Sequence, residues 1–323
     1  MTEEVNLGAL FGADAVESFM GLPVCRDLSQ VAASAALIGA PCATPYGAVG
    51  PYCRNAPTAL RQAAAMLAAN LDRHNFDIGG PLFPEGTQTA VDCGDIGWSE
   101  TDFAANRAAI AGAVTLLMQQ GAVPVVLGGD DSIPIPMLQA LGTTGARYTV
   151  VQVDAHIDWR QSHMDEALGL SSTMRRASEM PHIERIIQVG ARGIGSAASS
   201  DYQDALDWGA RFFTARDVHR DGIAPVLDQI APGAQVVVCL DVDALDPSIV
   251  PGVIGRAPGG LSYDQVLDLI RGVAGRGRIA AMDVVEYLPE ADIGGLGAVT
   301  VSRLIAAVLG LLARQQAGLP IAQ

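Results

Sequence analysis

The segment Val151-Gln-Val-Asp154-Ala-His156-Ile-Asp158 joins an apolar run to three polar side chains. Alternate side chains of a strand point to the same side, so Asp154, His156 and Asp158 can converge on one point beyond the strand end. Two carboxylates and an imidazole suit a divalent cation. The same sequence is also compatible with a polar strand end that binds no metal and is followed by a helix N-cap. Other parts of the chain are needed to distinguish the two interpretations.

Other apolar runs of strand length alternate with helix-like segments along most of the chain. Strands are predicted at residues 34–39, 89–94, 123–128, 148–153, 185–190, 211–214, 235–243 and 278–286. Helices are predicted at residues 57–70, 101–120, 132–141, 201–208, 224–230, 262–274 and 299–314. Near-continuous apolar strands that alternate with helices indicate an α/β fold, with a mostly parallel sheet and helices on both faces.

The length of 323 residues allows one large α/β domain or two small ones. We interpret residues 1–33 as an irregular N-terminal arm, with Phe11, Phe19 and Leu22 as its apolar anchors. Residues 34–323 are interpreted as a single domain, because no internal repeat or low-complexity linker interrupts the alternation.

Charge and hydropathy exclude several classes of partner. Acidic residues outnumber basic ones by 35 to 20, which gives a formal net charge of −15. Such a charge argues against nucleic acid or an anionic membrane and mildly favours a cationic ligand. No signal peptide is evident, and no apolar run reaches the roughly 18 residues of a membrane span. All 20 basic residues are arginine, which excludes lysine Schiff-base chemistry.

The cysteines predict a reducing compartment, the cytoplasm. There are five of them, an odd number, and none forms a CxxC pair. Cys42 and Cys53 flank a Pro/Gly loop and could approach each other, but we do not favour a disulfide there.

Acidic side chains follow four predicted strands at their carboxyl ends, where open parallel sheets bind ligands. The polar residues at these ends are Asp130, Asp131, Asp154, His156, Asp158, Asp241, Asp243 and Glu286. Seven carboxylates brought together without counter-ions would repel one another, and two divalent cations would remove the repulsion.

These motifs resemble those of the ureohydrolases, the family of arginase, agmatinase and related amidinohydrolases. The family's GGDHS, DAHxD and DxDxxDP motifs and its late glutamate correspond to GGDDS at residues 128–132, DAHID at 154–158, DVDALDP at 241–247 and DVVE at 283–286. The resemblance spans about residues 35–310. It implies an arginase-like three-layer sandwich.

The resemblance also implies two divalent metal ions, Mn²⁺ or Ni²⁺, that hold a bridging hydroxide. The implied roles are bridging of both ions for Asp154 and Asp241, one site completed by Asp131 and Asp158, and the other site completed by His156 and Asp243. Attack of the hydroxide on a guanidino carbon would give urea and an amine. Glu286 would bind the small cationic guanidino substrate through paired hydrogen bonds.

The sequence departs from the family at two places. Asp131 stands where the family has histidine, so one site becomes all-carboxylate, which suits Mn²⁺ better than a soft ion. The replacement of histidine by Asp131 either changes which metal ion this site prefers or weakens metal binding there. Alternatively, Asp131 caps the helix at 132–141 and binds no metal. Asp130 is expected to lie behind the ligands.

The second departure is a missing histidine that in arginase and agmatinase helps proton transfer. His163 is the candidate to replace it, although a surface histidine would look the same. The segment around it resembles the branch that hydrolyses guanidine and small substituted guanidines. Guanidine, an alkylguanidine or a biguanide is therefore expected as substrate, with agmatine and guanidinobutyrate left open. Tyr46, Tyr52 and Trp159 are candidates for an apolar or cation–π wall.

Three functions compete. The first is the binuclear amidinohydrolase, and the second is a catalytically weak subunit that partners an active homologue. The third, a single-metal deacetylase on the same architecture, is disfavoured because Asp158 and Asp243 would complete a second site that it does not need. The resemblance implies a homo-oligomer, trimer or hexamer, or a hetero-oligomer with a paralogous subunit.

Overall fold

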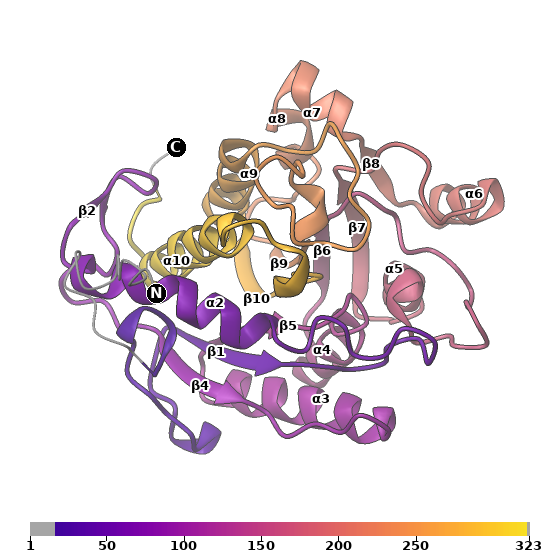
Figure 1. The fold of residues 1–323 in the computed structure, drawn as a ribbon. Coiled ribbons are helices and arrows are strands. Elements are labelled where there is room, and N and C mark those ends of the chain that lie inside the picture. The colour runs from indigo at the N-terminus through magenta and orange to yellow at the C-terminus, as the bar shows by residue number, and fades with distance from the viewer. Residues whose placement is uncertain (1–16, 322–323) are drawn as a thin grey trace, which may run out of the picture.

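Eight parallel strands form the sheet at the centre of the molecule (Figure 1), in a computed structural model that describes residues 17–321. Their order across the sheet is β4-β1-β5-β10-β9-β6-β7-β8. The strands are β1 (Ala35–Ala40), β4 (Val91–Asp95), β5 (Val123–Gly128), β6 (Tyr148–Val153), β7 (Ile183–Val189), β8 (Arg211–Phe213), β9 (Gln235–Asp241) and β10 (Arg278–Val285). A separate antiparallel hairpin pairs β2 (His74–Asn75) with β3 (Gly80–Pro81).

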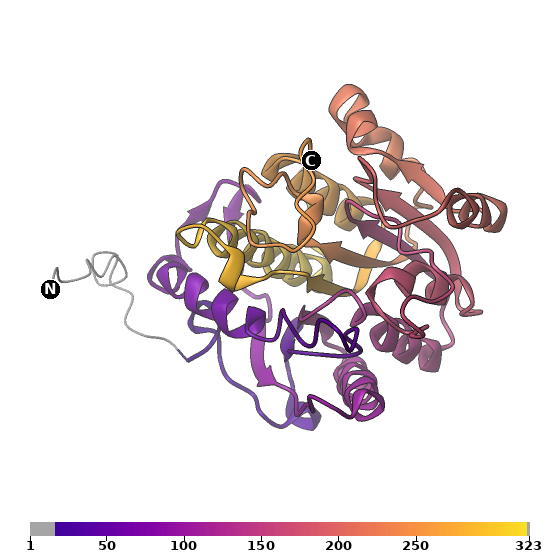
Figure 2. The same cartoon turned by 45° about the vertical axis from the view of Figure 1, so that its right-hand side comes forward.

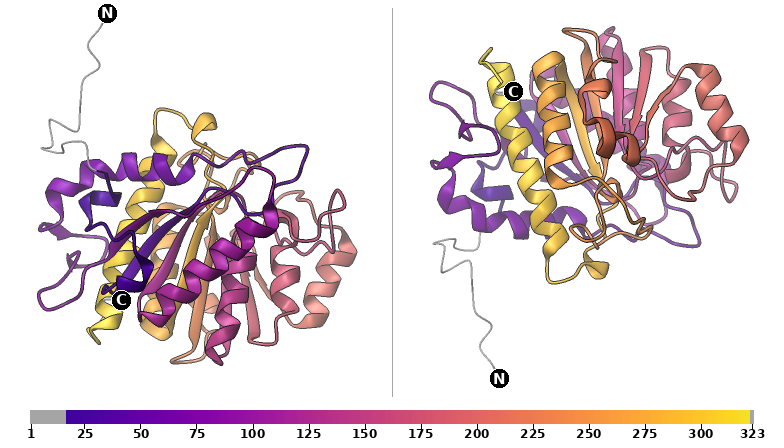
Figure 3. Two further views of the ribbon diagram at one scale, coloured as in Figure 1. Left: turned by 90° about the horizontal axis from the view of Figure 1, so that it is seen from below. Right: turned by 90° about the horizontal axis from the view of Figure 1, so that it is seen from above.

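Helices cover both faces of the sheet because successive strand residues enter opposite apolar layers. Leu37 of β1 lies in one layer and Ile38 in the other, and Val238 and Cys239 of β9 divide in the same way. One layer is closed by α2 (Ala56–Ala64), α7 (Ala215–Asp221), α8 (Ala224–Leu227), α9 (Tyr263–Arg276) and α10 (Leu296–Gln316). The other is closed by α3 (Phe103–Gln119), α4 (Pro134–Leu141), α5 (Thr173–Ser178) and α6 (Ser199–Trp208). Figure 3 shows the two faces and confirms the predicted three-layer sandwich.

The predicted strands agree with the observed ones to within a few residues. The main differences concern short elements. The helix predicted at residues 57–70 leaves α-helical geometry at Ala64 and continues as the 3-10 helix η3 (Ala65–Asn70). The strand predicted to reach Asp243 ends at Asp241, where the chain turns into η6 (Val242–Ala244). The helices α5 and α7 and the hairpin were not predicted, because they are too short to show a clear period.

The N-terminal arm is anchored as predicted, by Phe19 and Leu22, which are both buried. The backbone N–H of Phe19 donates to the carboxylate of Asp92 over 2.8 Å, which attaches the arm to β4. The third predicted anchor, Phe11, lies outside the described residues. The division into an arm and one domain remains a prediction.

One described helix, α10, has the length and hydropathy of a membrane span, although no uninterrupted apolar run of that length was found in the sequence. Of its most apolar 18-residue stretch, 78% is buried inside the protein. Its side chains pack with those of β10 and α9 in a single core layer, so the apolar character of α10 serves that core.

The order of the strands brings the sequence motifs together. Strands β5, β10, β9 and β6 are consecutive in the sheet, and the chain reaches them far apart in sequence (Figure 2). Their carboxyl ends are level, because Val153 pairs with Leu240 and Val285 pairs with Asp241. All four acidic motifs therefore leave the sheet side by side at one edge.

Candidate metal centre

Two overlapping groups of metal-ligand side chains lie at this edge of the sheet. In the Asp131 group, formed by Asp131, Asp154 and Asp158, the ligand oxygens lie within 4.8 Å of one another. The same spacing holds for the His156 group, formed by Asp154, His156 and Asp243. Asp154 belongs to both groups, so it lies where a bridging ligand is expected.

Gln152 orients two of these carboxylates. Its side-chain amide donates to Asp154 over 2.7 Å and to Asp158 over 2.6 Å, and its oxygen accepts a hydrogen bond from Gln188. Gln152 is buried in β6 between Val151 and Val153. An amide within an apolar strand is a local sequence signal for this role, which was not among the predictions.

The carboxylates of the Asp131 group are buried close together. Burial raises the pKa of Asp131 and Asp158 well above the usual carboxyl range, and the nearby charge of Asp154 raises both further. Asp131 Oδ2 is buried and has no hydrogen-bond partner among residues 17–321. An unpaired buried carboxylate oxygen is costly, and a cation at this position would satisfy it.

The alternative role for Asp131 as a helix cap is wrong. The carboxylate that accepts the N–H of Ser132, over 3.0 Å, belongs to Asp130. Within the described part of the chain no side chain caps α4, which begins with Pro134 after Ile133. Asp130 lies outside both ligand groups, as expected of a residue behind the ligands, and Asp131 is free to face Asp154 and Asp158.

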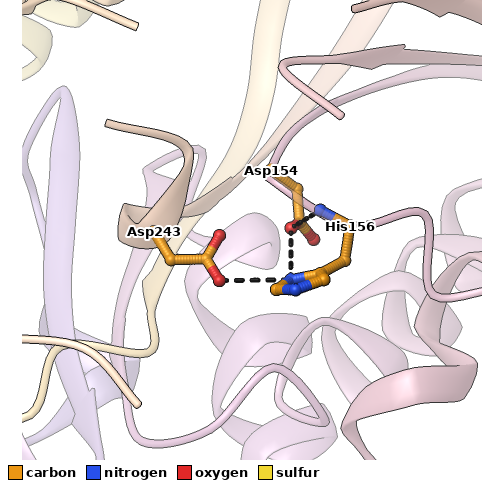
Figure 4. A group of neighbouring side chains, drawn as sticks. All are labelled: Asp154, His156 and Asp243. Carbon is orange, nitrogen blue, oxygen red and sulfur yellow. Dashed lines mark hydrogen bonds and ion pairs between the residues drawn. The ribbon is translucent and has the colours of Figure 1, made fainter. Parts of the chain in front are cut away.

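In the His156 group the imidazole lies between two carboxylates (Figure 4). His156 Nδ1 is 3.1 Å from Asp243 Oδ2 and 3.4 Å from Asp154 Oδ1. Hydrogen bonds to Asp154 and Asp243 raise the pKa of His156 to about 11. The same bond to His156 helps lower the pKa of Asp154 against the opposing effect of burial. Bound protons thus offset the negative charge of the carboxylates in this group, and a metal ion would displace these protons.

Asp241 lies beside the two groups but belongs to neither. Its Oδ1 accepts the N–H of Asp243 over 2.8 Å, and this bond starts the turn that aims Asp243. Burial, followed by the charges of Asp243 and Asp154, raises the pKa of Asp241 well above its usual range. Its predicted role as a second bridge is not tested by these contacts.

Asp246, the last acid of that motif, holds the loop beside the centre. It accepts the backbone N–H groups of Ser248, Gly259 and Gly260 over 3.0, 2.8 and 3.0 Å. Burial opposes the ionised form, but these bonds outweigh it and lower the pKa of Asp246 to about 2. Arg192 ties the same loop to the strand end by donating to the carbonyl oxygens of Asp243 and Ala257.

Glu286 lies next to the Asp131 group, at the end of β10. Its Oε1 accepts the N–H of Asp131 over 2.9 Å. Its φ of +66° is in the left-handed region, which is uncommon for a side chain of this size and is typical of functional sites. Burial raises the pKa of Glu286 to about 8, so a cation at its carboxylate would favour the charged form.

The three aromatic residues predicted to line a pocket have different positions. Trp159 is buried and packs edge-on against Trp208, which agrees with plain packing, the alternative to a wall. Tyr46 is buried too, and its hydroxyl contacts Ser171 over 2.9 Å. Tyr52 instead reaches Glu286, and its hydroxyl lies 2.6 and 2.8 Å from the two carboxylate oxygens, which share its one proton.

His163 is half-buried in the segment that follows β6. Arg160 donates to its Nδ1 over 2.8 Å, and its ring packs edge-on against Tyr46. Because arginine cannot accept a hydrogen bond, Nδ1 must accept and the proton of the neutral ring lies on Nε2. None of these contacts joins His163 to a residue of the two ligand groups.

A cavity of about 850 Å³ opens beside the centre and reaches it through His156. Its lining includes Arg192, Arg216 and His219, and no Asp or Glu among the residues that the structure describes. A solute can therefore approach His156 through a cavity whose charged side chains are basic.

The donor set fits two divalent cations. Carboxylates with one imidazole are suitable ligands for Mn²⁺, the unpaired Asp131 oxygen is available, and the shared Asp154 joins the two groups. The fold and the site thus define an α/β protein with a candidate binuclear metal centre at the carboxyl edge of its sheet.

Comparison with known proteins identifies the family. Residues 33–310 match the model of the arginase family. The human mitochondrial guanidino acid hydrolase is 28% identical over 293 residues, covering 89% of this chain and 80% of the relative. Chicken mitochondrial agmatinase is 28% identical over 300 residues, covering 91% and 85%. The chain belongs to the arginase family, whose hydrolases cleave C–N bonds of guanidino compounds.

Solved structures agree with this assignment. A crystal structure of a hypothetical agmatinase from Burkholderia thailandensis has a TM-score of 0.79 at 27% identity and covers 94% of this chain and 93% of that one. Proclavaminate amidino hydrolase from Streptomyces clavuligerus has a TM-score of 0.78 at 25% identity, with coverage of 94% and 99%.

Proposed function

We propose that this chain is a binuclear metal-dependent amidinohydrolase that cleaves a small guanidino compound to urea and an amine. The observation that carries the proposal is the pair of ligand groups sharing Asp154, with Glu286 beside them. A single-metal deacetylase would need only one group. The presence of both groups therefore supports the hydrolase over the deacetylase.

The proposed ligands divide between two ions. Asp131 and Asp158 would complete one site and His156 and Asp243 the other, with Asp154 between them and Asp241 as a second bridge. When bound, the ions would supply a nucleophile made from water near neutral pH. The carboxylate-rich donor set favours Mn²⁺, and Ni²⁺ is the second candidate.

Two side chains are proposed to act on the substrate. Glu286 would bind the guanidinium by a charge-assisted hydrogen bond, and its bond to the N–H of Asp131 would keep the reacting carbon beside the Asp131 group. His163 remains the candidate that carries a proton to the leaving amine. Its position between Arg160 and Tyr46 keeps a single ring N–H available.

The cavity lining narrows the substrate. Agmatine carries a second cation, and no carboxylate among the described lining residues matches it. We therefore favour guanidine, an alkylguanidine or a biguanide. Among longer compounds, a guanidino acid fits the basic lining better than agmatine does. Similar proteins include a guanidino acid hydrolase and a guanidinobutyrase.

A urea assay over a panel of guanidino compounds tests this proposal. Protein produced with Mn²⁺ or with Ni²⁺ is expected to release urea from at least one compact guanidine. The variant Asp154→Asn serves as the control, because it alters the ligand common to both groups. The proposal fails if the fully loaded protein releases no urea or if Asp154→Asn releases as much as the wild type.

One observation favours the second candidate function, a catalytically weak subunit beside an active homologue. Asp131 replaces the family's histidine and adds negative charge to a group that already holds Asp154 and Asp158. We favour a working site because Asp131 faces the other ligands and caps no helix.

We also propose a cellular compartment and an oligomeric state for this chain. All five cysteines are free, including Cys42 and Cys53, which supports a reducing cytoplasm. We propose a trimer or hexamer, or a hetero-oligomer with a paralogous subunit. Light scattering of the purified chain, alone and with such a subunit, measures the assembly.

A further inference from the structure

Tyr52 makes the contact at this centre that the family motifs do not account for. It lies in the loop between β1 and α2 and crosses to the end of β10, 234 residues further along the chain. Its hydroxyl is 2.6 Å from Glu286 Oε1 and 2.8 Å from Oε2. Nearly equal distances place the hydroxyl between the two oxygens, where an incoming planar cation would otherwise pair with both.

The contacts of Glu286 leave few places for a substrate. Each carboxylate oxygen accepts about two hydrogen bonds. The single proton of the Tyr52 hydroxyl is shared between the two oxygens. Among the described residues, Oε1 also accepts the N–H of Asp131, whereas Oε2 has no acceptor contact beyond its share of that proton. A substrate therefore finds one open position on Oε2 and a second acceptor in the lone pairs of the Tyr52 hydroxyl.

Building on the proposed function of Glu286, we propose that Tyr52 is a specificity-determining residue that binds the substrate. Its Oη and Glu286 Oε2, 2.8 Å apart, form the pair of acceptors that takes two N–H groups of one guanidinium. The ring that carries this hydroxyl takes up space beside the carboxylate and restricts this end of the site to compact guanidino compounds.

The chemistry of both partners supports this arrangement. A guanidinium presents its N–H groups as a planar, rigid fork, which suits two acceptors held at a fixed spacing. Tyr52 keeps its proton for Glu286, because burial and the charge of Glu286 raise the pKa of the phenol well above its usual value. Cys53, the residue next to it, is buried.

The test compares Tyr52→Phe with wild-type holoenzyme in urea assays with guanidine and N-methylguanidine. Loss of one acceptor is expected to raise KM about tenfold, the effect of a single hydrogen bond to a charged group, with kcat changed by less than about threefold. Tyr263→Phe is the matched control. Tyr263 lies on α9, and its hydroxyl donates to the carboxylate of Asp77 over 2.7 Å. The control should leave KM unchanged.

Tyr52→Ala tests the restriction on size. Removal of the ring is expected to raise kcat/KM for agmatine or guanidinobutyrate relative to guanidine by about tenfold or more. An unchanged ratio overturns that part of the proposal. A KM for guanidine that stays the same or falls in Tyr52→Phe overturns the acceptor role, and a fall would show that the hydroxyl competes with the substrate.

Calorimetric titration with guanidinium chloride at millimolar concentration separates this proposal from the proposed function. If the wild type releases no urea from any compound, the hydrolase proposal fails, but the dissociation constant of guanidinium still decides the role of Tyr52. This dissociation constant should be about tenfold higher in Tyr52→Phe than in the wild type and in Tyr263→Phe. Equal dissociation constants overturn the role of Tyr52.

Discussion

Replacement of Asp158 by Asn should stabilise the metal-free protein while it impairs metal binding. In the Asp131 group, Asp158 faces two other buried carboxylates within 4.8 Å. Asparagine can keep the acceptor that Gln152 uses over 2.6 Å and turn its amide N–H toward Asp131 or Asp154. It also tolerates the φ of +46° found at this position. One repulsive contact therefore becomes a hydrogen bond.

The magnitude follows from the spacing of the charges. At the upper limit of 4.8 Å for this spacing and an effective dielectric constant of about 20, two unit charges repel by roughly 3.5 kcal/mol. Protons bound at neutral pH already relieve part of this repulsion, so the free energy of unfolding should rise by about 2 kcal/mol. For a chain of 323 residues that corresponds to an increase in Tm of about 3 °C.

Thermal unfolding in EDTA and in Mn²⁺ measures both effects. Wild-type protein should gain a large increase in Tm from Mn²⁺, because ligands that bind only the folded state stabilise it, and Asp158→Asn should gain much less. Asp268→Asn, an exposed acid on α9, is the control and should behave as the wild type. A lower metal-free Tm in Asp158→Asn together with an undiminished response to Mn²⁺ would refute the reasoning.

Three further substitutions test neighbouring parts of the account. Asp131→His should lower urea release with Mn²⁺ and shift the preference toward softer ions; a large gain in both metal content and rate would instead identify a weakened native site. Asp246→Asn should lower the free energy of unfolding by about 1 kcal/mol by weakening three backbone hydrogen bonds. The folded-state pKa of about 2 at Asp246 lies below the unfolded value near 3.9, so this stabilisation is present above pH 4 and is lost as the pH falls toward 2. The free energies of unfolding of the wild type and Asp246→Asn, measured as a function of pH, should therefore converge near pH 2. Equal stability of the two proteins at pH 7 would contradict the role of Asp246. His163→Ala should lower kcat about a hundredfold without loss of metal, measured by urea release and metal analysis; an unchanged kcat removes His163 from the mechanism.

The strands could be predicted from the sequence because both faces of the sheet are covered. A run such as β5 is apolar at nearly every position, so it stands out without any periodic pattern. The order of the strands could not be derived in this way. That β10 and β9 lie between β5 and β6 depends on contacts between residues far apart in sequence.

The same limit applies to the centre. Asp154, His156 and Asp158 could be found because one strand end carries all three, and their motif resembles a known family. The contact between Tyr52 and Glu286 joins two segments without a local pattern, so the sequence suggested an aromatic wall and missed the hydrogen bond. The position of Gln152 did carry a local signal, a polar residue within an apolar strand.

The central claim is that these side chains form a binuclear centre, and counting the metal ions tests it most directly. Protein produced with Mn²⁺ and freed of loosely bound ions should contain about two ions per chain by elemental analysis. Asp243→Asn and Asp158→Asn, which each alter a single group, should each reduce the count to about one. A wild-type count of zero or one, or a loss of both ions from either variant with no intermediate count, would contradict two groups that share Asp154.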